Sequence, residues 1–232
     1  MKATVFLGGG RITAALLAGL HLARDPRPVL VYDRHPDKLR RLRRLYGVAI
    51  ELDLQRAVAQ ARLMIIAVRP SSVADLLREI GNFDRPLAAV SLAAGIPLSK
   101  LRERVGLPVR WARAMPSPLC RSRRGLTALA FDRNFPTAAR NELTNLFAQV
   151  GSTLEIREDE LDIFTVSYSP SHGYHALATL ARAAEKLGLS RKTALSAALT
   201  PLRTRSAPGM KATSPWLSCC TKQRRRAGPR LR

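Results

Sequence analysis

The chain has 232 residues, of which 46% are hydrophobic. This is enough for one large domain or two small ones and excludes a wholly disordered chain. No apolar run reaches the length that spans a bilayer, and the N-terminal segment does not have the pattern of a signal peptide. We therefore expect a soluble, cytoplasmic protein with no membrane partner. The three cysteines do not form a disulfide framework.

The formal net charge of +22 raises the question of nucleic-acid binding. The charge is uneven, because residues 200–232 contain nine Lys/Arg and no Asp/Glu, which leaves 30 basic and 17 acidic residues before them. The basic body also lacks interleaved aromatic and basic residues. Composition therefore argues against a nucleic-acid partner, while a native basic tail for an acidic partner stays open as an alternative.

The first two thirds of the chain alternate apolar segments with helical patterns. Strands are predicted at residues 3–8, 28–33, 62–70, 86–95, 108–116, 125–132 and 152–156. Helices are predicted at 11–23, 35–47, 71–81, 98–106 and 135–151, with Gly47 ending the second and Ser71 or Ser72 capping the third. Strands that are apolar on both faces and alternate with helices indicate an α/β domain with a doubly wound parallel sheet over residues 1–156.

The pattern changes near residue 158. Three consecutive helices are predicted, at 158–169, 172–188 and 190–199, with no strand between them. They indicate a small, truncated all-α segment over residues 157–199. After Leu199 no period is sustained, so residues 200–232 are interpreted as a basic, irregular tail.

A glycine cluster joins the first strand to the first helix. Gly8, Gly10 and Thr13 have the spacing of a dinucleotide-binding loop, in which glycines allow a tight turn and the close approach of a pyrophosphate. The N-terminus of the following helix offers free N–H groups and a positive dipole end to phosphate. A glycine turn in a non-binding α/β protein is the alternative.

Two charged residues end the second strand. An acidic residue at the position of Asp33 accepts hydrogen bonds from the ribose hydroxyls of NAD, whereas Arg34 suits the 2′-phosphate of NADP. The two residues favour different cofactors, and a plain charged loop that opens a helix is the alternative to both.

Other candidate positions follow from placement. The segments "AVRP" (67–70) and "SLAAGI" (91–96) end strands at the sheet edge where ligands bind, although ordinary strand termination explains them equally well. His172 and His175 have a spacing that puts two ligands on one helix face, but no carboxylate or cysteine cluster supports them, so no metal site is predicted.

Taken together, these motifs resemble the pyrroline-5-carboxylate reductases. "FLGGGRITAALLAGL" is similar to that family's glycine-rich opening, "AVRPSSV" to its A-V-K-P-Q segment, "SLAAGIPLSKL" to S-I-A-A-G-I, and "RAMPSPL" to R-x-M-P-N-T-P. "AAEKLGLSRKTALSAA" resembles its helical dimerisation region. The resemblance runs in order over residues 3–199.

The resemblance implies an enzyme, an NAD(P)-dependent oxidoreductase that uses NADP or NAD to pass a hydride to a cyclic imine, giving proline in proline biosynthesis. It also implies a homodimer formed through the helical segment. By the same resemblance, Met115 and Pro116 lie near the nicotinamide. The cofactor-binding residues that it implies are Gly8, Gly10, Arg11, Ile12, Asp33, Arg34, Val68, Arg69, Pro70, Ala94, Gly95 and Ser117.

The segment "SPSHG" falls where the family has S-G-S-G-P, whose backbone grips the substrate carboxylate, which assigns Ser169, Ser171 and Gly173 to the substrate. Pro170 and His172 replace two glycines of that loop. His172 is the one candidate catalytic residue, as a proton donor. The alternatives are a related dehydrogenase of another small carboxylate and a dinucleotide-binding protein without catalysis.

The family continues beyond the helices with a T-S-P-G-G-T-T-like substrate loop, which residues 200–232 lack. Back-translated with chosen synonymous codons and read two bases later, residues 201–228 can encode an amphipathic segment that ends in T-P-G-G. We therefore interpret the tail as the product of a frameshift, which is expected to weaken reductase activity.

Overall fold

The structure is a computed structural model that describes residues 2–168 and 170–203. It divides into two compact units, the first running to Tyr168 and the second beginning at Ser169.

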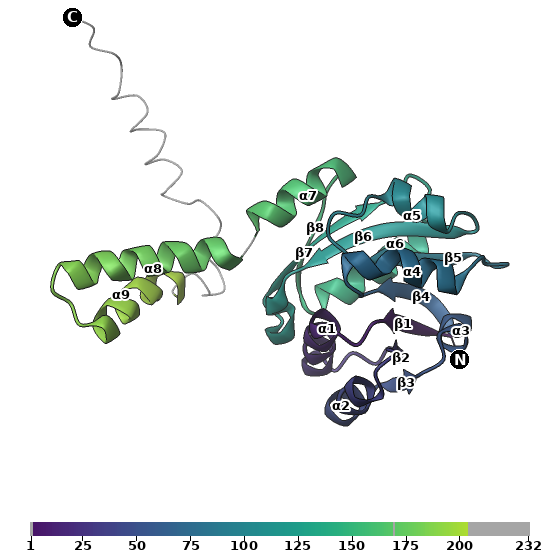
Figure 1. Ribbon diagram of the computed structural model, residues 1–232, viewed down its shortest axis with the longest axis horizontal. Helices are drawn as coiled ribbons and strands as arrows, with labels where there is room; N and C mark the ends of the chain where they lie inside the picture. The colour runs from purple at the N-terminus through teal and green to yellow at the C-terminus, as the bar shows by residue number, and fades with distance from the viewer. Residues whose placement is uncertain (1, 169, 204–232) are drawn as a thin grey trace, which may run out of the picture. The chain divides into compact units, whose positions relative to one another are not determined.

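Unit 1 is built on one eight-stranded sheet, shown on the right of Figure 1. Its strands are β1 (Ala3–Leu7), β2 (Val29–Tyr32), β3 (Ala49–Glu51), β4 (Ala61–Ile66), β5 (Leu87–Ser91), β6 (Val109–Pro116), β7 (Gly125–Phe131) and β8 (Gly151–Glu155). Their order across the sheet is β3-β2-β1-β4-β5-β6-β7-β8. From β1 the strand order runs one way to β3, and from β4 it runs the other way across the sheet. The point between β1 and β4 is therefore the switch point, where an open α/β sheet binds its ligands.

Helices cover both faces of this sheet. One apolar core lies under α3 (Leu54–Ala59), α4 (Pro70–Ile80) and α5 (Leu98–Arg104) and includes Trp111 of β6. The other core lies under α1 (Arg11–Leu22), α2 (Pro36–Tyr46) and α6 (Thr137–Ala148). The central strands β1, β4 and β5 are buried on both faces because they lie between these helical layers, which explains why their sequences are largely apolar.

The structure confirms the α/β class and corrects several details. The sheet is mostly parallel, but β7 pairs with β6 in the antiparallel direction. The segment between them holds only a 3-10 turn, η1 (Pro118–Ser122), and is too short for a parallel crossover. The short elements β3 and α3 were not predicted. The predicted cap of α4 at Ser71 or Ser72 is wrong, because α4 begins at Pro70 with Arg69 as its N-cap.

Unit 1 also includes α7 (Glu158–Ser167), which the sequence analysis grouped with the helical segment. Leu161 of α7 is fully buried against Ala128 and Ala130 of β7, and this contact attaches the helix to the sheet. The predicted strand at 152–156 and helix at 158–169 therefore belong to the same compact unit.

Unit 2 contains α8 (Pro170–Lys186) and α9 (Arg191–Arg203), which pack against each other. Most of the tail over residues 200–232, together with the proposed frameshift, lies outside the described residues. Of the helices in the described part of the chain, none is long and apolar enough to cross a membrane.

Candidate functional site

The turn after β1 has the geometry that the glycine motif predicts. Gly8 adopts a φ of +115°, and a Cβ added to it would lie 2.7 Å from the Ala67 carbonyl oxygen at the end of β4. Its own N–H donates to the Tyr32 carbonyl at 2.7 Å. Only glycine fits this conformation without strain, so Gly8 fixes the path of the chain between β2 and β4.

The third position of the motif is occupied by Thr13, where glycine or alanine is usual. Thr13 is fully buried, and its hydroxyl donates to the Gly8 carbonyl at 2.5 Å. The larger side chain is therefore accommodated, and its hydrogen bond joins the first turn of α1 to the loop that precedes it.

The start of α1 is open to a ligand. Gly10 is the N-cap and contributes no side-chain cap, and the first helical hydrogen bond runs from the Ala14 N–H to the Gly10 carbonyl at 3.0 Å. The N–H groups of the first helical turn have no acceptor within the helix. A Cβ at Gly10 would have only the Ala67 carbonyl oxygen near it, at 3.9 Å. This N-terminus can therefore accept the pyrophosphate of a dinucleotide.

Asp33 lies under the same loop with only 8% of its surface exposed. Its Oδ2 accepts the Gly9 N–H at 2.8 Å, and its Oδ1 accepts the His35 N–H at 2.9 Å. Lys38 Nζ lies 3.4 Å from Oδ1. The carboxylate thus already braces two backbone segments around the loop.

A cleft of about 1080 Å³ opens over this loop. Its walls are the Gly8–Gly10 turn, the start of α1, the end of β2 with α2, the end of β4 with the start of α4, and residues of η1. Eight of the predicted cofactor residues line it: Gly8, Gly10, Arg11, Ile12, Asp33, Arg34, Val68 and Arg69.

The other predicted cofactor residues lie outside this lining. Pro70 is the first residue of α4. Ala94 and Gly95 form an exposed turn after β5, and Ser117 is a buried residue after β6 whose hydroxyl accepts the Leu126 N–H at 3.2 Å. Pro70, the Ala94–Gly95 turn and Ser117 nevertheless follow the carboxyl ends of β4, β5 and β6, respectively. Several other lining residues belong to none of the sequence motifs, among them Tyr32, His35, Lys38, Arg41, Pro118 and Arg121.

The predicted substrate residues fall in unit 2. Ser169 lies outside the described residues, and Ser171, His172 and Gly173 belong to the first turns of α8. The predicted helix beginning at 172 thus starts two residues earlier, at Pro170, whose fixed φ suits a first helical position. In the described ranges, no group of three or more His, Cys, Asp or Glu side chains could hold a metal ion.

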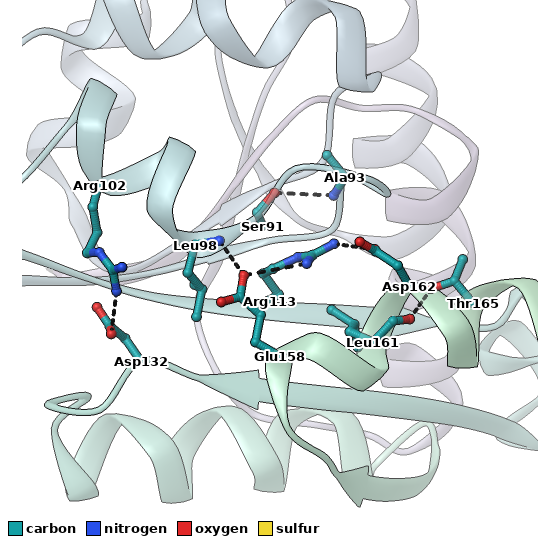
Figure 2. A network of polar contacts seen from close by, with 10 residues as sticks. All are labelled: Ser91, Ala93, Leu98, Arg102, Arg113, Asp132, Glu158, Leu161, Asp162 and Thr165. Carbon is teal, nitrogen blue, oxygen red and sulfur yellow. Dashed lines mark hydrogen bonds and ion pairs between the residues drawn. The ribbon is translucent and has the colours of Figure 1, made fainter.

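A second polar cluster lies where β6 meets α7, shown in Figure 2. Arg113 is 1% exposed in its side chain, and its guanidinium lies 2.7 Å from Asp162 and 3.5 Å from Glu158. Glu158 also accepts the Leu98 N–H at the start of α5. Asp162 is 56% exposed, so one end of this ion pair faces solvent. The cluster ties α5 and α7 to the sheet beside Met115.

A doubly wound sheet with a glycine turn and an open helix N-terminus at its switch point is the architecture of dinucleotide-binding proteins, the class that includes the NAD(P)-dependent oxidoreductases. A family model described as NADP oxidoreductase, coenzyme F420-dependent, matches residues 4–95. The pyrroline-5-carboxylate reductase of Corynebacterium melassecola is 32% identical over 203 residues, covering 84% of this chain and 74% of that one. The chain therefore belongs to the pyrroline-5-carboxylate reductase family. Members of this family reduce the cyclic imine pyrroline-5-carboxylate to proline with NAD(P)H.

Solved structures agree on the fold. The 1-pyrroline-5-carboxylate reductase of Streptococcus pyogenes gives a TM-score of 0.80 at 24% identity, covering 94% of this chain and 83% of that one. The Plasmodium falciparum enzyme, solved with NADP bound, gives a TM-score of 0.73 at 18% identity, covering 97% and 90%. These likenesses confirm the Rossmann-like architecture.

Proposed function

We propose that this chain is an NAD(P)H-dependent reductase that converts pyrroline-5-carboxylate to proline. The observation that carries the proposal is the cleft over the Gly8–Gly10 turn, in a chain that belongs to this reductase family. When bound, the nicotinamide supplies a hydride for the imine carbon. The chain supplies position and charge, which are the main protein contributions to such a reaction.

We assign the pyrophosphate to the start of α1. Gly8 and Gly10 leave room for close approach, and the N–H groups of Arg11 and Ile12 face the opening that the missing cap leaves. The Arg11 side chain adds a positive charge to the lining of the same cleft. Val68 and Arg69 also line the cleft, at the start of α4.

We assign the substrate carboxylate to Ser169, Ser171 and Gly173, with His172 as the proton donor to the imine nitrogen. The support for these roles is the resemblance of "SPSHG" to the family's substrate loop. Replacing His172 by alanine removes this donor, so it is expected to lower turnover and to change the pH profile of the reaction. Equal pH profiles for the variant and the parent protein would remove His172 from the mechanism.

A non-catalytic dinucleotide-binding protein is the second candidate. The observation that favours it is the helical conformation of residues 170–173, where the family uses glycines for close backbone approach. An assay with pyrroline-5-carboxylate and each nicotinamide cofactor decides between the two. Turnover supports the reductase, whereas cofactor binding without turnover of this imine supports the second candidate or a dehydrogenase of another small carboxylate.

We propose that a second copy of the chain is the partner of unit 2. Several large apolar side chains of unit 2 are exposed, including Tyr174 and Leu180 of α8 at 71% and 60% and Leu187, just after α8, at 88%. Exposed apolar patches of this kind commonly mark interaction surfaces. Sedimentation equilibrium of the full chain tests the dimer.

Sequencing the gene tests the frameshift, because codons incompatible with the alternate reading frame after residue 200 would exclude it.

A further inference from the structure

A second cavity of unit 1 lies at the opposite edge of the sheet from the cofactor cleft. Its volume is about 470 Å³, and its lining includes the first residues of β1, β2 and β3, at the amino ends of these parallel strands. We call it the rear cavity. Among the described residues, its lining and that of the cofactor cleft share only Tyr46. The rear cavity is therefore a separate space, and its volume is within the range of small-molecule sites.

The rear cavity combines an apolar floor with aromatic rings. Leu17 and Leu20 of α1 and Leu30 of β2 are buried residues of its lining. The rings of His21 and Tyr46 also belong to the lining, with their centroids 6.1 Å apart and their planes at 58° to each other. Aromatic rings readily accept a further ring in tilted or offset contact. This lining therefore suits a ligand with a small aromatic body.

Arg24 carries the uncompensated charge of the rear cavity. The other arginine of the lining, Arg27, donates to Asp25 at 2.8 Å, and the side chain of Asp25 is only 6% exposed. These two charges cancel. Arg24 is exposed, and no carboxylate in the described part of the chain pairs with it. Because a guanidinium binds a carboxylate through two parallel hydrogen bonds, the lining matches a ligand with one carboxylate.

Arg24 also occupies a backbone position that usually belongs to glycine. It follows the C-cap of α1 with a φ of +54°. Its N–H donates to the His21 carbonyl at 3.0 Å, and the Asp25 N–H donates to the Leu20 carbonyl at 3.1 Å. Helices commonly end in this way with a glycine, since a side chain strains the left-handed conformation. A cationic side chain therefore stands at the cavity in spite of a backbone cost.

The end of α1 opposes anion binding less than a bare helix C-terminus would. The negative end of a helix dipole arises from the carbonyl groups that have no partner in the last turn. The N–H groups of Arg24 and Asp25 occupy two of these carbonyls. The guanidinium of Arg24 is thus the dominant local charge on this side of the cavity.

We propose that the rear cavity binds a small aromatic carboxylate. Arg24 holds the carboxylate, while the leucine floor and the rings of His21 and Tyr46 receive the aromatic ring. A neutral aromatic molecule lacks the partner for Arg24, and inorganic phosphate gains nothing from the apolar floor. The proposal goes beyond the reductase function, since it involves neither the cofactor cleft nor turnover of the imine.

NMR titration of the methyl-labelled full chain with benzoate tests the proposal. The methyl groups of Leu17, Val29 and Val48 report on the rear cavity, whereas those of Ile12 and Val68 report on the cofactor cleft. We expect saturable shifts in the first set, with benzoate bound at least about fivefold more tightly than its neutral analogue benzamide or inorganic phosphate. Shifts confined to the cleft methyls, the absence of saturable shifts, or equal affinities for benzoate and benzamide would overturn the proposal.

Two variants of Arg24 separate binding from folding. Arg24→Gly removes the guanidinium and gives the left-handed position the residue that suits it, so it should weaken benzoate by about fivefold or more without lowering the melting temperature. Arg24→Lys keeps the charge without the paired hydrogen bonds and should lose less affinity. Unchanged benzoate affinity in Arg24→Gly would overturn the proposal.

Arg44→Gln is the matched control, because Arg44 is an exposed arginine of α2 outside the lining of the rear cavity. It removes the same unit of charge as Arg24→Gly and measures the general effect of lowering the positive field of the chain. If Arg44→Gln weakens benzoate as much as Arg24→Gly does, benzoate responds to the net charge alone and the rear cavity is not its site.

Discussion

Two glycines of the same turn should respond in opposite ways to alanine. Gly8→Ala places a Cβ on a residue with φ of +115°, 2.7 Å from the Ala67 carbonyl oxygen. The backbone strain alone costs about 1–3 kcal/mol, and the contact with the backbone of β4 raises the total to about 2–4 kcal/mol. For a chain of this length the melting temperature should fall by about 5–15 °C.

Gly10→Ala should keep the fold and lose the ligand. The φ of Gly10 is −77°, and the nearest atom to an added Cβ is 3.9 Å away. The weaker N-cap and the lower entropy of the unfolded chain partly cancel, so stability should change by less than about 1 kcal/mol. The Cβ then stands where the pyrophosphate approaches the backbone, and NADPH affinity should fall by about tenfold or more, which is about 1.4 kcal/mol.

Urea unfolding followed by circular dichroism measures the first effect, and fluorescence titration with NADPH measures the second. Wild-type affinity in Gly10→Ala would show that no phosphate approaches this turn and that the motif is a simple strand-to-helix connection. Unchanged stability in Gly8→Ala would show that the turn does not need its positive φ.

Three further predictions concern single groups. Asp162→Asn should cost about 1–2 kcal/mol in urea unfolding, because the buried Arg113 loses a partner. Asp159→Asn on the same helix should have a much smaller effect, since its partner Arg157 is exposed. Equal effects would contradict the role of the Arg113 cluster. Burial raises the pKa of the Cys120 thiol to about 11, so at pH 8 peptide mapping should find Cys120 unalkylated in the native chain and alkylated in urea, and rapid native labelling would refute its burial. The side-chain hydrogen bond from Arg27 lowers the pKa of Asp25. The stability that this pair contributes is therefore present above the usual pKa of the carboxyl group and is lost as the pH falls through the lowered value. Arg27→Gln should flatten the plot of unfolding free energy against pH in that acidic range, and an unchanged slope would count against the pair.

Much of unit 1 could be predicted because its strands and helices carry strong local patterns. β4 is continuously apolar from Leu63 and β5 as far as Val90. α2 ends at Gly47, which adopts the left-handed conformation expected of a C-terminal glycine. β3 has three residues and α3 has six, which is too short for either period to be evident. The only local signal for α3 is Asp53, whose side chain caps the helix by accepting the Arg56 N–H at 2.8 Å.

The site was predictable in part for a similar reason. The glycine spacing and Asp33 are sequence signals with a known geometry, and the structure brings both to one cleft. Lys38 and Arg41 were missed because α2 carries basic residues on several sides, and only the packed helix shows which of them face the cleft. The antiparallel direction of β7 had a signal that was not used, namely a connection too short for a crossover.

In the glycine motif the third small residue usually allows the helix to pack closely against its neighbours. In this chain two residues of α1, Thr13 and Gly19, share that role. Thr13 keeps the helix against the loop through its hydrogen bond to Gly8. Gly19, further along α1, allows η1 to approach so closely that an added Cβ would lie 2.2 Å from the Cys120 carbonyl oxygen. Because η1 also supplies Pro118 and Arg121 to the cleft, the absence of a side chain at Gly19 determines where that wall can stand. The cofactor cleft therefore depends on a glycine that lies outside the glycine motif and does not itself line the cleft.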